Sequence, residues 1–81
     1  MMIRRVVLPI SDLAQHLEDV TAIAGALAQR RGITHVDVNP RTETAYVEYD
    51  PTRGGLLDLI ATVENMGFQL GAPSLLNAPL H

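Results

Sequence analysis

Residues 33–50 read ITHVDVNPRTETAYVEYD, and they carry the clearest indication of the fold. Its two ends, residues 33–38 and 44–49, alternate between apolar and polar side chains, and the polar segment 39–43 separates them. Because successive side chains of a strand point to opposite faces of a sheet, each end predicts a strand with one covered face. The short polar turn joins the two strands into a hairpin. The covered face is expected to hold Val36, Val38, Ala45, Val47 and Tyr49, and the open face His35, Asp37, Tyr46 and Glu48.

A helix is expected on each side of this hairpin. Before it, Ser11 is a candidate N-cap, and apolar residues then recur at intervals of three and four until Gly32 ends the helix. After it, Gly55 is expected at the N-cap of a second helix that Gly67 closes, with Asp58 near the positive end of the helix dipole. The two apolar stripes consist of Leu13, Leu17, Val20, Ile23, Ala24 and Leu27, and of Leu56, Leu59, Ile60, Val63 and Met66.

The ends of the chain complete the pattern. Residues 3–8 are mostly apolar and rich in β-branched side chains, which predicts a first strand that Pro9 stops. Residues 68–70 predict a short last strand, and residues 72–81, with two prolines, a C-terminal tail. The element order is then βαββαβ. We therefore expect an α+β, ferredoxin-like sandwich, in which two helices cover one face of a four-stranded antiparallel sheet, over residues 1–71.

Composition limits the function. At 81 residues the chain has room for one domain, and 47% of its residues are apolar. Nine acidic residues against six arginines give a net charge of −3, which argues against nucleic-acid binding because that needs a strongly basic surface. The chain has no cysteine, which excludes disulfides and thiolate ligands. No apolar run is long enough for a signal peptide or a membrane span, so we expect a cytoplasmic location and no membrane insertion.

No enzyme is expected from the sequence. Ser11, Asp12 and His16 are the residue types of a catalytic triad, but they lie in one short stretch. Gly54 and Gly55 form a lone glycine pair, which fits the entry of a helix better than a phosphate-binding loop.

Several short motifs give the chain a family resemblance. From residue 3 to Gly71 it resembles the heavy-metal-associated domain, the fold of small copper chaperones and of N-terminal modules of metal-pumping P-type ATPases. The resemblance implies a non-catalytic role in metal-ion handling, with a metal-transporting P-type ATPase or another metal-handling protein as partner. The motifs that carry it are Gly32-Ile33 with Val36 and Val38, then Val47-Glu48-Tyr49-Asp50-Pro51, then Ile60, Val63-Glu64 and Met66-Gly67-Phe68.

The chain departs from this family at the metal loop. Such domains bind a soft metal through Met-x-Cys-x-x-Cys, and counting back from Gly32 places the two cysteine positions on His16 and Asp19. In one interpretation His16 and Asp19, with Glu18 less well placed, bind a divalent ion such as Zn(II), Co(II) or Ni(II), because imidazole and carboxylates are harder ligands than thiolates. His35, on the open sheet face, is not expected to complete this site, and His81 lies on a tail whose course the sequence does not indicate.

Two other interpretations need no metal. If the first helix runs from Ser11 onward, His16, Glu18 and Asp19 are its solvent-exposed side. Alternatively, function resides on the open sheet face, where Tyr46, His35 and Glu48 are candidate interface residues for a homodimer or a larger partner. The sequence leaves these three interpretations open.

Overall fold

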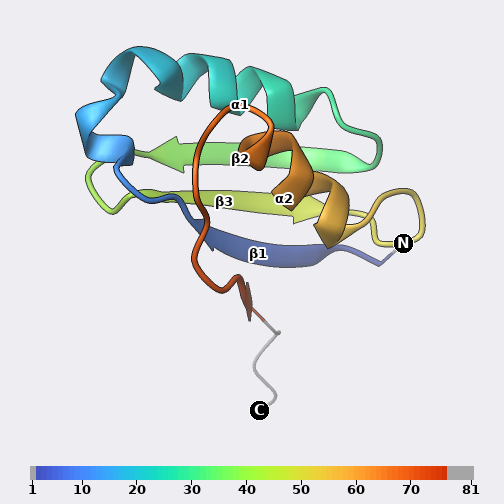
Figure 1. Cartoon of the computed structure of the whole chain (residues 1–81). Coiled ribbons are helices and arrows are strands. Elements are labelled where there is room, and N and C mark those ends of the chain that lie inside the picture. Colours follow the sequence, from blue (N-terminus) through green and yellow to red (C-terminus); the bar gives the residue numbers. More distant parts are fainter. Residues whose placement is uncertain (1, 77–81) are drawn as a thin grey trace.

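The computed structural model describes residues 2–76 and confirms the ferredoxin-like architecture (Figure 1). Its four strands form one antiparallel sheet in the order β2-β3-β1-β4, and both helices pack on the same face of it. In chain order the elements are β1 (Arg4–Pro9), the 3-10 turns η1 (Leu13–Gln15) and η2 (Leu17–Asp19), α1 (Val20–Ala28), β2 (Ile33–Asn39), β3 (Thr44–Tyr49), α2 (Leu56–Glu64) and β4 (Ser74–Leu76).

The core lies between the sheet and the two helices. On β3 the buried side chains alternate as predicted, since Ala45, Val47 and Tyr49 are buried while their neighbours are only partly covered. β1 and both helices also bury apolar side chains, because an apolar side chain removed from water stabilises the fold. The remaining buried residues are Val6, Leu8, Ile10, Leu13, Ile23, Leu27, Leu59 and Val63.

The register of the sheet fixes what lies on the face that the helices leave open. Residues that pair across neighbouring strands lie on the same face of the sheet. The paired residues of β2, β3, β1 and β4 therefore form two rows across the open face. One row joins His35, Glu48, Arg5 and Leu76, and the other joins Asp37, Tyr46, Val7 and Ser74.

The predicted start of the first helix is wrong. Residues 11–19 form two 3-10 turns, with Asp12 in the left-handed region at φ 65°, and α1 begins only at Val20. Leu17, expected in the buried stripe, is 62% exposed. Two tertiary contacts override the helical spacing. Leu13 is drawn into the core, and the Ala14 N–H donates to Glu43 Oε2 at 3.2 Å.

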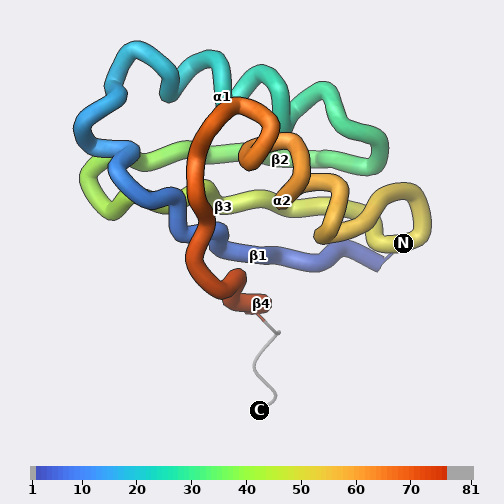
Figure 2. Tube along the Cα trace, viewed as in Figure 1, coloured from blue at the N-terminus to red at the C-terminus, as the bar shows by residue number. Residues whose placement is uncertain are grey.

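The predicted last strand is also displaced. Residues 68–70 contain only an isolated bridge between Leu70 and Ile10, whereas β4 lies at Ser74–Leu76 and pairs with β1. The Gly71 N–H donates to Pro9 O at 3.0 Å, so the chain passes the end of β1 before it joins the sheet (Figure 2). The sheet thus extends into the segment predicted to be a tail. Residues 77–81, including His81, lie outside the described residues, and the division at residue 71 stays a prediction.

The second helix begins where it was predicted, but it ends at Glu64, so Met66, expected in its buried stripe, lies beyond the helix and is 37% exposed. Gly55 is its N-cap, Asp58 lies in its first turn, and Gly67, at φ 96°, follows its end. None of the helices within residues 2–76 has the length and apolar character that crossing a membrane requires.

Candidate metal centre

The segment between β1 and α1, residues 10–19, is here called the β1–α1 loop. Three contacts hold it in place. The Ile10 N–H donates to Glu43 O at 2.7 Å, the Ser11 N–H donates to Gln69 O at 2.8 Å, and Leu13 is fully buried. The loop is therefore fixed by the core and by two segments that are distant in sequence, which are the β2–β3 turn and the link between α2 and β4.

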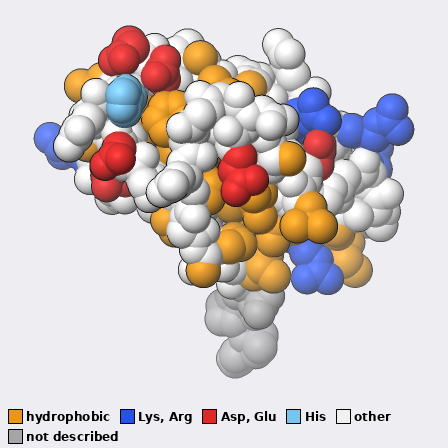
Figure 3. All heavy atoms as spheres, in the orientation of Figure 1, with side chains coloured by type: hydrophobic (Ala, Val, Ile, Leu, Met, Phe, Trp, Pro, Cys, Tyr) orange, Lys and Arg blue, Asp and Glu red, His pale blue; other side chains and the backbone are white. Residues whose placement is uncertain are grey.

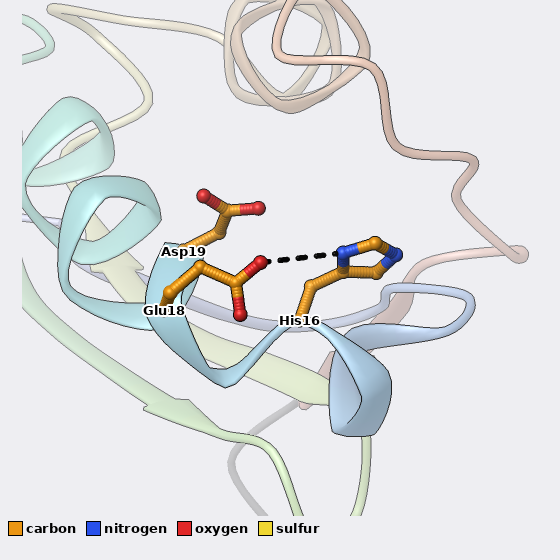
Figure 4. A group of neighbouring side chains, drawn as sticks. All are labelled: His16, Glu18 and Asp19. Carbon is orange, nitrogen blue, oxygen red and sulfur yellow. Dashed lines mark ion pairs between the residues drawn. The ribbon is translucent and has the colours of Figure 1, made fainter.

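This loop brings the three predicted ligands together. His16, Glu18 and Asp19 each offer one ligand atom, and these atoms all lie within 4.8 Å of one another. His16 Nδ1 lies 3.7 Å from Glu18 Oε2, and the three side chains lie close together along the loop (Figure 4). The sequence suggested that Glu18 was the least well placed of the three. The irregular backbone between the two 3-10 turns instead places it directly beside His16.

The surroundings of the cluster are acidic. At the end of the molecule where the β1–α1 loop lies, a histidine is flanked by acidic side chains (Figure 3). Asp12 belongs to the same loop, and Glu43 is tied to it through Ala14. These carboxylates attract cations to this end of the domain, and the effect decreases with ionic strength because the charges are exposed.

The donor atoms determine which ions fit. Around Zn²⁺ with ligand bonds of 2.0–2.1 Å, tetrahedral donors are separated by about 3.3 Å, so the cluster would have to tighten around an ion. His16 and Glu18 are exposed, which leaves their side chains free to move. Imidazole and carboxylates suit divalent borderline or hard ions, and they do not fit the soft ions Cu(I) or Hg(II), which prefer sulfur.

A pocket of about 450 Å³ opens beside the cluster. The β1–α1 loop lines it with Ser11, Asp12, His16 and Asp19, and residues 66–69 line the rest. The ring of Phe68 meets the His16 imidazole edge-on, with the ring centroids 5.7 Å apart. Sequence reasoning missed this pocket, because Met66-Gly67-Phe68 served only as a family motif. The contact with Phe68 restricts the orientation of the His16 ring.

The predicted interface residues also meet, on the open face of the sheet. Tyr46 Oη donates to Glu48 Oε2 at 2.5 Å, and the His35 ring lies edge-on to the Tyr46 ring at 6.0 Å. The hydrogen bond to Glu48 is the largest cause of a raised pKa of Tyr46. His35 is thus engaged with Tyr46 and is not a member of the metal-ligand cluster. Whether this face binds a partner stays a prediction.

No family model matches the chain. Solved structures do match it over most of its length. Oxidized MerP from Ralstonia metallidurans CH34 has a TM-score of 0.78 and 18% identity, over 86% of this chain and 96% of that one. A mercury-bound MerP, at a TM-score of 0.61 and 19% identity over 91% of this chain and 97% of that one, is described as the periplasmic protein of the bacterial mercury detoxification system.

Two structures described as copper-related have TM-scores similar to that of the oxidized MerP. The N-terminal domain of a potential copper-translocating P-type ATPase from Bacillus subtilis, in its Cu(I)-loaded state, has a TM-score of 0.78 and 26% identity over 85% of each chain. A putative copper-ion-binding protein from Bacillus anthracis str. Ames has a TM-score of 0.79 and 21% identity, over 86% of this chain and 97% of that one. This chain therefore has the fold of the heavy-metal-associated domains, and it has that fold without a Cys-x-x-Cys motif.

Proposed function

We propose that this chain is a non-catalytic domain of metal-ion handling that binds a divalent transition-metal ion, Zn(II), Co(II) or Ni(II), through His16, Glu18 and Asp19. The observation that supports the proposal most directly is the gathering of three potential ligand atoms within 4.8 Å on an irregular loop. The family resemblance assigns this same loop the two metal-binding thiolates. The similar structures are described as metal-binding proteins, which supports the general class of function.

The composition of the cluster suggests how it would work. Two carboxylates balance the charge of a divalent ion, and the neutral imidazole supplies a nitrogen ligand. All three ligands come from one short exposed segment, so water fills the remaining coordination positions. Such a site binds its ion weakly and releases it readily, which suits a domain that passes an ion on.

The partner in this proposal is a metal-transporting P-type ATPase or another metal-handling protein. One of the similar structures is the N-terminal domain of a potential copper-translocating P-type ATPase, which supports this class of partner. The cytoplasmic location expected from the sequence stays a prediction, since MerP is described as periplasmic.

A titration with Co(II), followed by its visible absorption, tests the metal site. We expect His16→Ala to weaken Co(II) binding by at least about tenfold, because the loss of one nitrogen ligand leaves only carboxylates. Glu18→Gln and Asp19→Asn should each weaken it as well, since an amide oxygen carries no charge.

His35→Ala is the matched control, because it removes the other histidine of the described residues, which contacts Tyr46 instead. It should bind Co(II) as the wild type does. Equal affinities for the wild type and His16→Ala, or equal losses in the two histidine variants, would contradict the proposed site. The same titration repeated with Zn(II) and Ni(II) ranks the three ions.

A second candidate function is a metal-free interaction module that uses the open sheet face. The observation that favours it is the joined cluster of Tyr46, His35 and Glu48, which presents an aromatic ring on a sheet face that no helix covers. Self-association through this face is tested below.

A further inference from the structure

One residue of the β2–β3 turn, Glu43, holds the β1–α1 loop at two points. Its backbone oxygen accepts a hydrogen bond from the Ile10 N–H at 2.7 Å, and its Oε2 accepts one from the Ala14 N–H at 3.2 Å. Ala14 and Glu43 are 29 positions apart in the sequence. Within residues 2–76, Glu43 is the only side chain from outside the loop that hydrogen-bonds to it. The shape of the loop therefore depends on a residue that lies outside it.

The backbone of Glu43 is strained. Its φ of 56° lies in the left-handed region, which costs free energy for any residue with a Cβ and which glycine adopts freely. Strained residues persist where the surrounding contacts hold them, and they gather at functional sites. A glycine at this position would remove the strain, but it would also remove the carboxylate that accepts from Ala14.

The Ala14 N–H has two alternative acceptors. In a helix with Ser11 as its N-cap, Ala14 is the third helical residue, and the Ser11 hydroxyl accepts the N–H of that residue. In the structure this N–H donates to Glu43 instead, and the left-handed backbone of Asp12 interrupts the helix at its start. Glu43 thus competes with the cap that would begin the helix predicted from the apolar spacing.

The two forms of the loop place the three candidate ligands differently. In a helix, His16 and Asp19 would remain neighbours because they are three residues apart, but Glu18 would point to the side nearly opposite His16. The irregular loop instead brings Glu18 Oε2 to 3.7 Å from His16 Nδ1. The third ligand therefore joins the cluster only in the irregular form.

We propose that Glu43 is a positioning residue for the candidate metal site. Its carboxylate keeps residues 11–19 out of the helix and so gathers His16, Glu18 and Asp19. Glu43 acts through the loop backbone, and it is not a member of the ligand cluster found within residues 2–76. The inference rests on the proposed function for the purpose of this arrangement, whereas the choice between loop and helix needs no metal.

NMR of the metal-free protein tests the choice between loop and helix. We expect Glu43→Gly to move the Cα chemical shifts of residues 11–19 toward helical values, because the Ala14 N–H becomes available to Ser11. Glu43→Gln is the matched control, since its amide oxygen can still accept from Ala14, and it should keep the wild-type shifts. Unchanged shifts in Glu43→Gly, or the same helical shifts in both variants, would overturn the inference.

Urea denaturation separates positioning from general stability. Glu43→Gly should unfold at a urea concentration no lower than the wild type, because glycine relieves the left-handed backbone. A clearly lower midpoint would show that Glu43 serves the stability of the whole fold, and it would overturn the positioning role.

The Co(II) titration then connects the loop to the metal. Glu43→Gly should weaken Co(II) binding by about tenfold, as the loss of supporting residues around a metal commonly does, while Glu43→Gln should stay within about twofold of the wild type. Equal losses in the two variants would mean that Glu43 acts by its charge alone, which contradicts the inference. A wild type that binds no Co(II) would refute the proposed function, and the metal-free chemical shifts would still decide whether Glu43 holds the loop.

Discussion

Among the glycines of residues 2–76, Gly54 has the least room for a side chain. A Cβ added there would lie 2.2 Å from Arg31 O, a backbone atom that cannot move independently. The turn after α1 and the turn after β3 meet at this point. We expect Gly54→Ala to lower the free energy of unfolding by roughly 1–3 kcal/mol, as overpacking does elsewhere, in urea denaturation followed by circular dichroism.

Gly25→Ala is the control for this prediction. Gly25 lies inside α1, and nothing within 4 Å would meet an added Cβ. Because alanine restricts the unfolded chain and favours helix, this variant should be more stable by roughly 0.5–1 kcal/mol. Wild-type stability of Gly54→Ala would show that the two turns approach less closely than described.

At the scale of the elements, α2 offers two leucines with opposite environments. Leu59 is buried against the sheet, whereas Leu57 is 80% exposed on the outer side of the same helix. Leu59→Ala should reduce the free energy of unfolding by roughly 2–5 kcal/mol, because it leaves a cavity in the core. Leu57→Ala should change it by less than about 0.5 kcal/mol in the same denaturation experiment. Similar losses in both variants would contradict the orientation of α2.

An ion pair joins α2 to the segment that follows α1. The Arg30 guanidinium donates two hydrogen bonds to the Asp58 carboxylate, at 2.8 and 2.9 Å, and Asp58 raises the pKa of Arg30. Both side chains are partly exposed, so solvent and salt weaken their attraction. The pair therefore contributes little to the stability of the fold.

For the whole molecule, the second candidate function predicts a homodimer through the open sheet face. In that case Tyr46→Glu should shift the sedimentation coefficient to that of a monomer. The new carboxylate would lie beside Glu48 and would have to lose water in the interface, which costs free energy when no partner balances its charge. Leu57→Glu, which adds the same charge on the helical side, should leave the dimer intact. Monomers for the wild type and Tyr46→Glu at all concentrations would exclude self-association through this face.

The candidate site was predictable in its residues but not in its geometry. The sequence singled out His16, Glu18 and Asp19, yet the apolar spacing of Leu13, Leu17 and Val20 also predicted a helix through them. Local spacing cannot show that Leu13 is buried by the core while Leu17 is left in solvent. The same limit hid the pocket, because the approach of residues 66–69 depends on how the whole chain folds.

The amino-acid sequence alone is enough to predict the covered sheet face and the order of the elements. When one face of a sheet must be buried, the alternation in residues 33–38 and 44–49 fits only one facing of the two strands. A shift by one residue would expose every apolar side chain. The form of the β1–α1 loop, the position of β4 and the contact of His16 with Phe68 depend instead on tertiary contacts. Contacts between distant segments, such as Ala14 with Glu43 and Ser11 with Gln69, compete there with local preferences and override them.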